Sequence, residues 1–105
     1  MSEGKVFDLS RLASKLESEG GYFLDFLKIR NLEAGIILLH PNEADTQEPH
    51  SEDELYYVIK GNAWMEMGKK KIEVKEGSII FIPAGLRHRF YGNREDLYVL
   101  YVFAA

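Results

Sequence analysis

Residues 77–93 read GSIIFIPAGLRHRFYGN, and this stretch predicts more of the fold than any other part of the chain. The apolar run 79–82 predicts a short buried strand. Pro83 fixes its own φ angle and Gly85 permits a positive one, so a tight, defined turn is expected directly after the run. His88 follows that turn and begins the next predicted strand, which gives its imidazole a fixed place in the fold.

The same alternation of short apolar runs and turn residues extends over most of the chain. Glycine, asparagine and proline separate the runs, and short strands at this regular spacing predict an all-β sandwich or barrel rather than a βαβ sheet. The predicted strands are 22–28, 32–40, 54–60, 63–67, 71–74, 78–82, 88–91 and 97–103.

A single helix is predicted at residues 8–19, where leucines recur at helical spacing and Gly20 follows. We therefore divide the chain into an N-terminal helical extension, 1–20, and a β-barrel domain, 21–105.

Several predicted strands are apolar on both faces, above all 79–82 and 98–103. Only one face of such a strand can line a barrel interior, so the other needs a cover. The helix or a partner subunit could supply it, and we expect a homodimer. Trp64 and Met65, in a hairpin bounded by glycines, are expected to lie in the core; the alternative for the aromatic ring is a place near the barrel mouth, where it could stack on a ligand.

Composition excludes several classes of protein. The 105 residues include no cysteine, which excludes disulfides and zinc–thiolate sites. The net charge of −4 and the absence of a basic stripe argue against nucleic-acid binding. We see no secretory signal and no apolar segment of about 20 residues, so we expect no membrane partner and a cytoplasmic location.

Potential metal ligands lie just before the predicted strand 54–60. Glu48, His50 and Glu54 share one parity, and side chains two residues apart in an extended chain lie on one face. Pro49 makes that rule approximate here. Imidazole and carboxylate donors suit iron, manganese, zinc, nickel or cobalt better than magnesium or calcium.

Two segments resemble the two signature motifs of the cupin superfamily. The second motif runs Gly, five residues, Pro, one residue, Gly, two residues, His, three residues, Asn. Asn93 stands one residue later than that pattern, and the positions that match it are Gly77, Pro83, Gly85 and His88.

The first motif matches in part. His50, Glu54 and Gly61 have the family spacing, but Glu48 replaces the upstream histidine and Asn42 replaces the leading glycine. The resemblance covers roughly residues 20–103 and implies a small single-domain cupin. Its fold would be a double-stranded β-helix, or jelly-roll barrel, with a short N-terminal helix.

The resemblance also implies a metal site. His50, Glu54 and His88 match ligand positions of the family, and Glu48 occupies the fourth, with Gln47 as a rival if the chain bulges near Pro49. One divalent transition metal ion per chain is expected: iron, manganese, zinc or nickel.

Three functions are compatible with this sequence. The first is a metal-dependent enzyme, of oxygenase, isomerase or lyase type, acting on a small organic substrate inside the barrel. The second is a non-catalytic module that binds or senses a small molecule. The third is a degenerate, metal-free cupin in which Glu54 pairs with Arg87 or Arg89.

Overall fold

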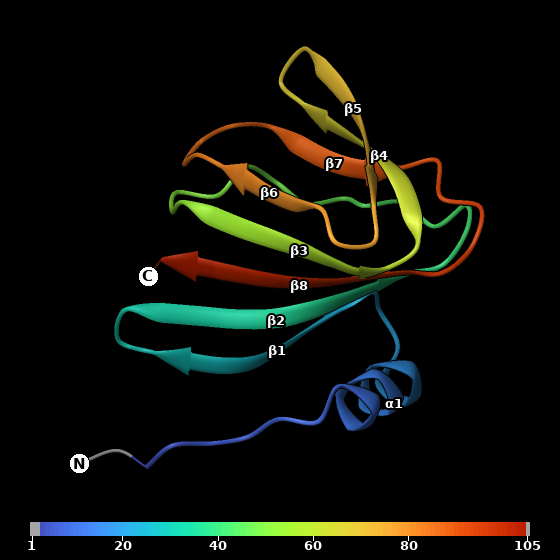
Figure 1. Ribbon diagram of the computed structural model, residues 1–105. Coiled ribbons are helices and arrows are strands. Elements are labelled where there is room, and N and C mark those ends of the chain that lie inside the picture. The colour runs from blue at the N-terminus through green and yellow to red at the C-terminus, as the bar shows by residue number, and fades with distance from the viewer. Residues whose placement is uncertain (1–2, 105) are drawn as a thin grey trace.

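One helix and eight strands make up the computed structural model, which describes residues 3–104 (Figure 1). Each predicted element is present, and its ends lie within one residue of the prediction. The elements are α1 (Leu9–Glu19), β1 (Phe23–Ile29), β2 (Leu32–Leu39), β3 (Glu54–Lys60), β4 (Asn62–Met67), β5 (Lys70–Lys75), β6 (Ile79–Ile82), β7 (His88–Tyr91) and β8 (Leu97–Ala104). The proposed division into an N-terminal extension, 1–20, and a barrel, 21–105, stays a prediction. Its residues 1, 2 and 105 lie outside the described residues.

The strands form two antiparallel sheets, which confirms the all-β prediction. One has the order β1-β2-β8-β3-β6 and the other the order β5-β4-β7. The core lies between them, where Tyr56 and Val58 of the larger sheet share one cluster with Met65 and Phe90 of the smaller. Met65 is buried as predicted. The prediction for Trp64 was wrong, because strand alternation turns this side chain to the outer face, where it is 41% exposed.

Helix α1 covers the outer face of β1 and β2. Asp8 caps it by accepting a hydrogen bond from the Ser10 backbone N–H at 2.9 Å. Leu16 packs against Ile36 and Leu38, and burying this one side chain contributes about 2 kcal/mol. Strand β2 is therefore apolar on both faces because one face meets the barrel interior and the other meets α1. No helix within residues 3–104 is long and apolar enough to cross a membrane.

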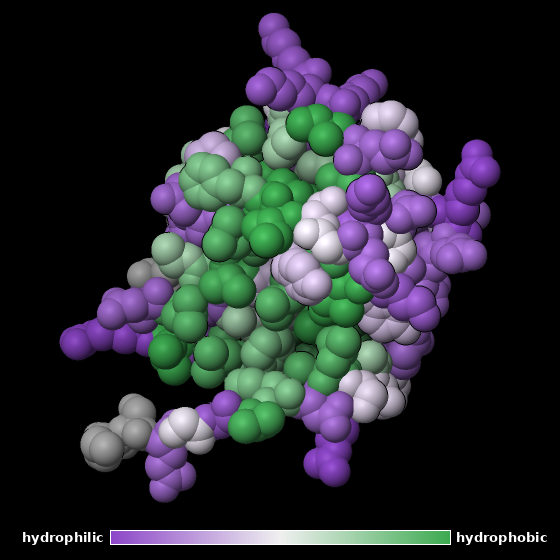
Figure 2. Space-filling model, viewed as in Figure 1, coloured by the Kyte–Doolittle hydropathy of each residue, from purple (hydrophilic) through white to green (hydrophobic). Residues whose placement is uncertain are grey.

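The outer face of β3 and β6 has no such cover within the described chain. Leu55 pairs with Phe81 and Tyr57 with Ile79 across the strand ladder, and these four side chains are 42% to 72% exposed. Figure 2 shows apolar side chains gathered over these strands and the neighbouring β8. One large sheet thus has a helix-covered outer face at one edge and a bare apolar outer face at the other.

Candidate metal centre

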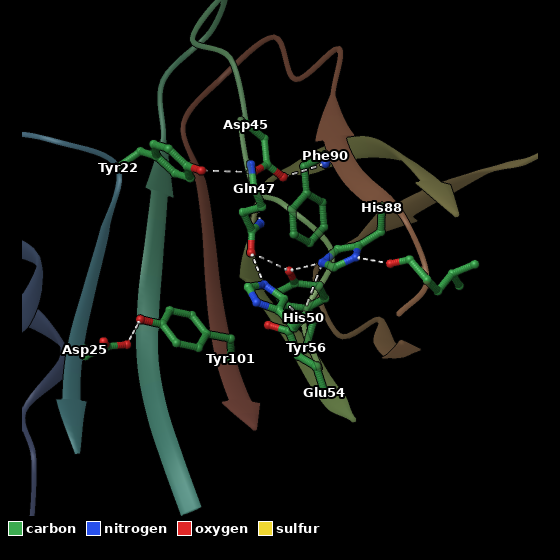
Figure 3. Close-up of polar contacts among 11 residues, drawn as sticks. Tyr22, Asp25, Asp45, Gln47, His50, Glu54, Tyr56, His88, Phe90 and Tyr101 are labelled. Atoms are coloured by element: carbon green, nitrogen blue, oxygen red, sulfur yellow. Dashed lines mark hydrogen bonds and ion pairs between the residues drawn. The ribbon is translucent and has the colours of Figure 1, made fainter. Parts of the chain in front are cut away.

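Three of the predicted ligands converge inside the barrel from separate parts of the chain (Figure 3). His50 lies in the segment that joins β2 to β3, Glu54 begins β3, and His88 begins β7. One ligand atom from each lies within 4.8 Å of the other two. Oε1 of Glu54 is 3.3 Å from Nε2 of His88 and 4.0 Å from Nε2 of His50. Two imidazoles thus face one carboxylate.

The tautomer of His88 follows from its hydrogen bonds. Nδ1 lies 2.9 Å from the carbonyl oxygen of Leu86, which can only accept, so we assign the proton of the neutral ring to Nδ1. Nε2 then keeps its lone pair, and it lies 3.0 Å from the Tyr56 hydroxyl. Burial lowers the pKa of His88, but the contact with Glu54 and the Leu86 carbonyl outweigh burial and raise it above its ordinary value.

The carboxylate of Glu54 lacks a partner. The residue is 2% exposed, and neither oxygen accepts a hydrogen bond of good geometry from the described residues. Its contact with His88 becomes an ion pair only when that ring carries a second proton. Because an uncompensated buried charge costs on the order of several kcal/mol, the pattern calls for a cation at this point. Two imidazoles and a carboxylate are also a donor set suited to a transition metal.

The arginine pairs expected for a metal-free cupin are not formed at this carboxylate. Arg89 donates to Glu66 at 3.1 Å and stacks over the ring of Tyr91, on the outside of the barrel. Arg87 is exposed. Strand alternation explains both positions, because the residues on either side of His88 point away from the interior.

Gln47, rather than Glu48, points to the other ligands. Its side-chain N–H donates to Asp45 at 2.9 Å, which turns its Oε1 inward. That oxygen lies 3.2 Å from Nε2 of His50 and accepts from the Tyr56 hydroxyl at 3.2 Å. Glu48 is exposed and lies outside the group of converging ligand atoms.

Asp45 is a site residue that the sequence analysis missed. It is 8% exposed and accepts hydrogen bonds from Gln47, from the Phe90 backbone N–H at 2.8 Å and from the Tyr22 hydroxyl at 3.2 Å. These bonds tie the β2–β3 segment to β7. An aspartate in a polar stretch between two strands gives no sequence signal of such a role.

The two segments that carry the histidines are also held together by main-chain contacts. The Gly85 N–H donates to the carbonyl oxygen of His50 at 2.6 Å, and the Ala84 N–H donates to the Asp53 side chain at 2.9 Å. Gly85 has a φ of 82°, which the turn before His88 requires and which other residues adopt at a cost. The predicted turn is thus also the contact that joins the two motifs.

A pocket of about 370 Å³ opens beside His50 and Gln47. Tyr101 and Phe103 of β8 form part of its wall, and the ring of Phe103 lies edge-on to that of His50 at 4.5 Å. Its volume falls within the range of small-molecule sites. A larger hollow of about 530 Å³ lies around Trp64, but none of the candidate ligands lines it, so we assign the chemistry to the smaller one.

Two curated proteins are similar to this chain over most of its length. An uncharacterized protein of Streptomyces coelicolor is 38% identical over 100 residues, which cover 95% of each chain. Acireductone dioxygenase 1 of Vitis vinifera is 29% identical over 99 residues, which cover 82% of this chain and half of the relative. The chain thus spans about half the length of that dioxygenase.

Structural and family comparisons identify the fold. A solved cupin of Methanocaldococcus jannaschii, described as having a double-stranded β-helix fold, superposes with a TM-score of 0.73 at 18% identity, over 78% of this chain and 77% of that one. The family model described as "Cupin domain" matches residues 35–103, which include both histidine-bearing segments. The predicted fold is therefore confirmed as a double-stranded β-helix with one short N-terminal helix, and the chain belongs to the cupin family.

Proposed function

We propose that this chain is a metal-dependent enzyme of the oxygenase type, which holds iron(II) and acts on a small organic substrate in the pocket beside His50. The observation that carries the proposal is the buried, unpartnered carboxylate of Glu54 between two imidazoles. Two histidines and one carboxylate are the ligand set typical of non-haem iron oxygenases. The dioxygenase named among the relatives supports the same chemistry.

His50, Glu54 and His88 are the proposed ligands, and the side-chain oxygen of Gln47 is the proposed fourth donor. Asp45 is a positioning residue, because its hydrogen bond to the Gln47 amide nitrogen turns the oxygen toward His50. The Leu86 carbonyl does the same for His88, since it keeps the proton on Nδ1 and leaves Nε2 free to ligate.

Tyr56 is the residue best placed to act on a proton. Its hydroxyl touches two proposed ligands, at 3.0 Å from His88 Nε2 and 3.2 Å from Gln47 Oε1. Burial, and then the negative charges of Glu54 and Asp45, raise its pKa far above the ordinary value, so it keeps its proton at neutral pH. It can therefore donate a hydrogen bond, which Gln47 Oε1 accepts here. A bound iron(II) ion would supply Lewis acidity and redox chemistry at the adjoining ligands.

Metal content tests the site. Wild-type protein should hold about one ion per chain by elemental analysis, and His50→Ala, His88→Ala and Glu54→Gln should each bind it at least about 100-fold more weakly. His40→Ala is the matched control, because His40 lies outside the group and should leave the metal content unchanged. Full retention of the metal in the His88→Ala variant would contradict the proposal.

Dioxygen uptake separates the enzyme from the binding module. The iron-loaded protein and its His88→Ala variant are compared in an oxygen electrode with a panel of small organic compounds. The enzyme proposal requires uptake in the wild type that the variant lacks. Stoichiometric iron without uptake for any compound would favour the binding module instead.

A second copy of the chain is the partner we propose for the bare outer face of β3 and β6. Leu55, Tyr57, Ile79 and Phe81 form a flat apolar surface without a charged side chain among them, and such a surface is complementary to itself across a two-fold axis. Analytical ultracentrifugation should find a dimer, and the double variant Ile79→Glu/Phe81→Glu should be monomeric. Trp64→Glu, on the other sheet, should stay dimeric, and a monomeric wild type would contradict this proposal.

A further inference from the structure

The pocket beside His50 is acidic at its rim. Asp25, Glu33, Glu48 and Glu52 all line it, and the described lining residues include no lysine or arginine. Lys28 pairs with Glu33 in the β1–β2 ladder but does not line the pocket. A concave site lined by one sign of charge concentrates ions of the opposite sign.

Part of the pocket wall is aromatic. Tyr22, Phe23, Tyr101 and Phe103 contribute to it, and the faces of such rings attract cations. Figure 3 shows Tyr101 hydrogen-bonded to Asp25 on the side of the pocket opposite Gln47 and His50. The pocket thus combines acidic side chains with aromatic ones and reaches His50 and Gln47.

Two further observations point to a ligand in this pocket. Behind His50, which lines the pocket, the buried Glu54 carboxylate lacks a hydrogen-bond partner, and its Oε1 lies 4.0 Å from Nε2 of His50. At the rim, burial and then the negative charge of Asp25 raise the pKa of Glu33. The rim carboxylates repel one another, and a cation between them would relieve that repulsion.

We propose that the substrate is a small organic cation whose protonated amine lies among Asp25, Glu33, Glu48 and Glu52 and whose other end reaches the metal centre. This inference rests on the proposed function, because it names the substrate class of the same site. It disfavours carboxylates and phosphates as substrates, since each would bring a negative charge to an acidic rim.

Three probes of one shape and different charge test the inference on the metal-free protein. Benzylamine, benzyl alcohol and benzoate are titrated at pH 7, and their affinities are read from protein NMR shifts of residues lining the pocket. Benzylamine should bind about tenfold or more tightly than benzyl alcohol, and benzoate should bind least. Added salt should reduce the difference.

Two variants test whether the rim carboxylates cause the preference for benzylamine. Asp25→Asn/Glu33→Gln keeps the shape of both side chains and should lower the affinity for benzylamine about tenfold while leaving that for benzyl alcohol unchanged. Glu73→Gln removes an exposed carboxylate that lines the other hollow, and it should change neither.

The outcomes separate this inference from the proposed function. Equal binding of the three probes, a preference for benzoate, or a preference for benzylamine that survives in the double variant would overturn the inference, whatever the metal content. A preference for benzylamine that the double variant loses would support it. If the same protein fails to take up metal, the acidic pocket stands and the oxygenase proposal falls.

Discussion

The inner face of β3 has two unlike ends. At one end Glu54 meets His88 and lacks a hydrogen-bond partner, while at the other Val58 lies opposite Val99 among apolar side chains only. Both ends are almost fully buried, at 2% and 0% exposure. Tyr56 lies between them, with its ring in the core and its hydroxyl at His88.

Equal burial therefore has opposite consequences along one strand. Removing Val58 from water stabilises the fold, whereas removing the Glu54 carboxylate from water without a partner opposes it. The apolar end holds the barrel together, and its stability allows the other end to keep a charged group ready for a ligand. The predictions below alter one end and measure the other.

The largest effect is expected at the apolar end. Leu97 is fully buried beside Leu39, and Leu97→Ala should destabilise the protein by about 2–5 kcal/mol because it leaves a cavity. Urea denaturation measures this change, and Leu97→Met, which conserves volume, should cost less than about 1.5 kcal/mol. At concentrations of denaturant where Leu97→Ala is folded, its metal content should equal that of the wild type. A lost metal site would show that the two ends are not independent.

A change of opposite sign is expected at the polar end. Glu54→Leu replaces the unpartnered carboxylate with an apolar group of similar volume, so the metal-free protein should become about 1–3 kcal/mol more stable. The measurement is urea denaturation with a chelator, repeated from pH 7 to pH 9, because the raised pKa of His88 extends its ion pair with Glu54 to higher pH and deprotonation of the ring removes it. Glu66→Leu is the control, because that carboxylate is partly exposed on the outer face. A destabilised Glu54→Leu would mean that Glu54 has a partner in solution.

Metal affinity should fall as the pH is lowered. A protonated imidazole cannot ligate, and the pKa of His88 is raised above its ordinary value, so competition by protons begins at a higher pH than for a free histidine. Below that pKa the affinity should drop about tenfold per pH unit, or about 1.4 kcal/mol. Competition titrations with a chelator between pH 5 and 8 measure it. A metal affinity that does not change between pH 5 and pH 8 would contradict the assignment of His88 as a ligand.

The smallest effect is expected at His40, which lies just beyond the end of β2. His40 follows β2, and its ring lies 2.7 Å from Asp96 and 3.1 Å from Glu17 of α1. The hydrogen bond to Asp96 raises the pKa of His40, although burial of the ring opposes the rise. A raised pKa stabilises the fold below the unfolded value, near 6.5, and that contribution disappears as the pH rises through the folded value.

Because His40 is 44% exposed at its side chain, this contribution should stay below about 1 kcal/mol. The stability difference between wild type and His40→Gln, measured by denaturation at pH 6 and pH 9, should therefore shrink toward the higher pH. If the stability difference between the two proteins grew with pH instead, the pH dependence would have the opposite sign, and the ion pairs of His40 could not be its cause.

The strands could be predicted almost completely from the sequence. Their ends coincide with turn residues such as Gly61, Gly77 and Gly92, which all have positive φ angles, so each turn marks a boundary. Trp64 was misplaced because hydrophobicity alone does not say which face of a strand a large aromatic residue occupies. The alternation with its buried neighbours, Ala63 and Met65, does say so.

The site could be predicted only where the chain is regular. Glu54 and His88 begin strands, and the spacing of the two motifs predicted that both would lie close to His50. Glu48 was expected from strand parity and from its place in the first motif, with Gln47 as its rival, but the segment before β3 contains no strand, so parity does not apply there. The inward oxygen belongs to Gln47 because Asp45 holds its amide, a contact between side chains that no periodicity encodes.

The main-chain bond from Gly85 to His50 has a consequence for how the proposed site would acquire a metal. In a zinc finger the ion itself brings distant ligands together, and the empty chain is unfolded. Here a backbone hydrogen bond joins the two segments without the ion. The chain should therefore fold before it binds a metal, and folding should not favour one metal over another. If the proposed site binds a metal, it would take the ion that its surroundings supply when the protein is made, and the proposed activity would depend on local metal abundance as much as on the ligands.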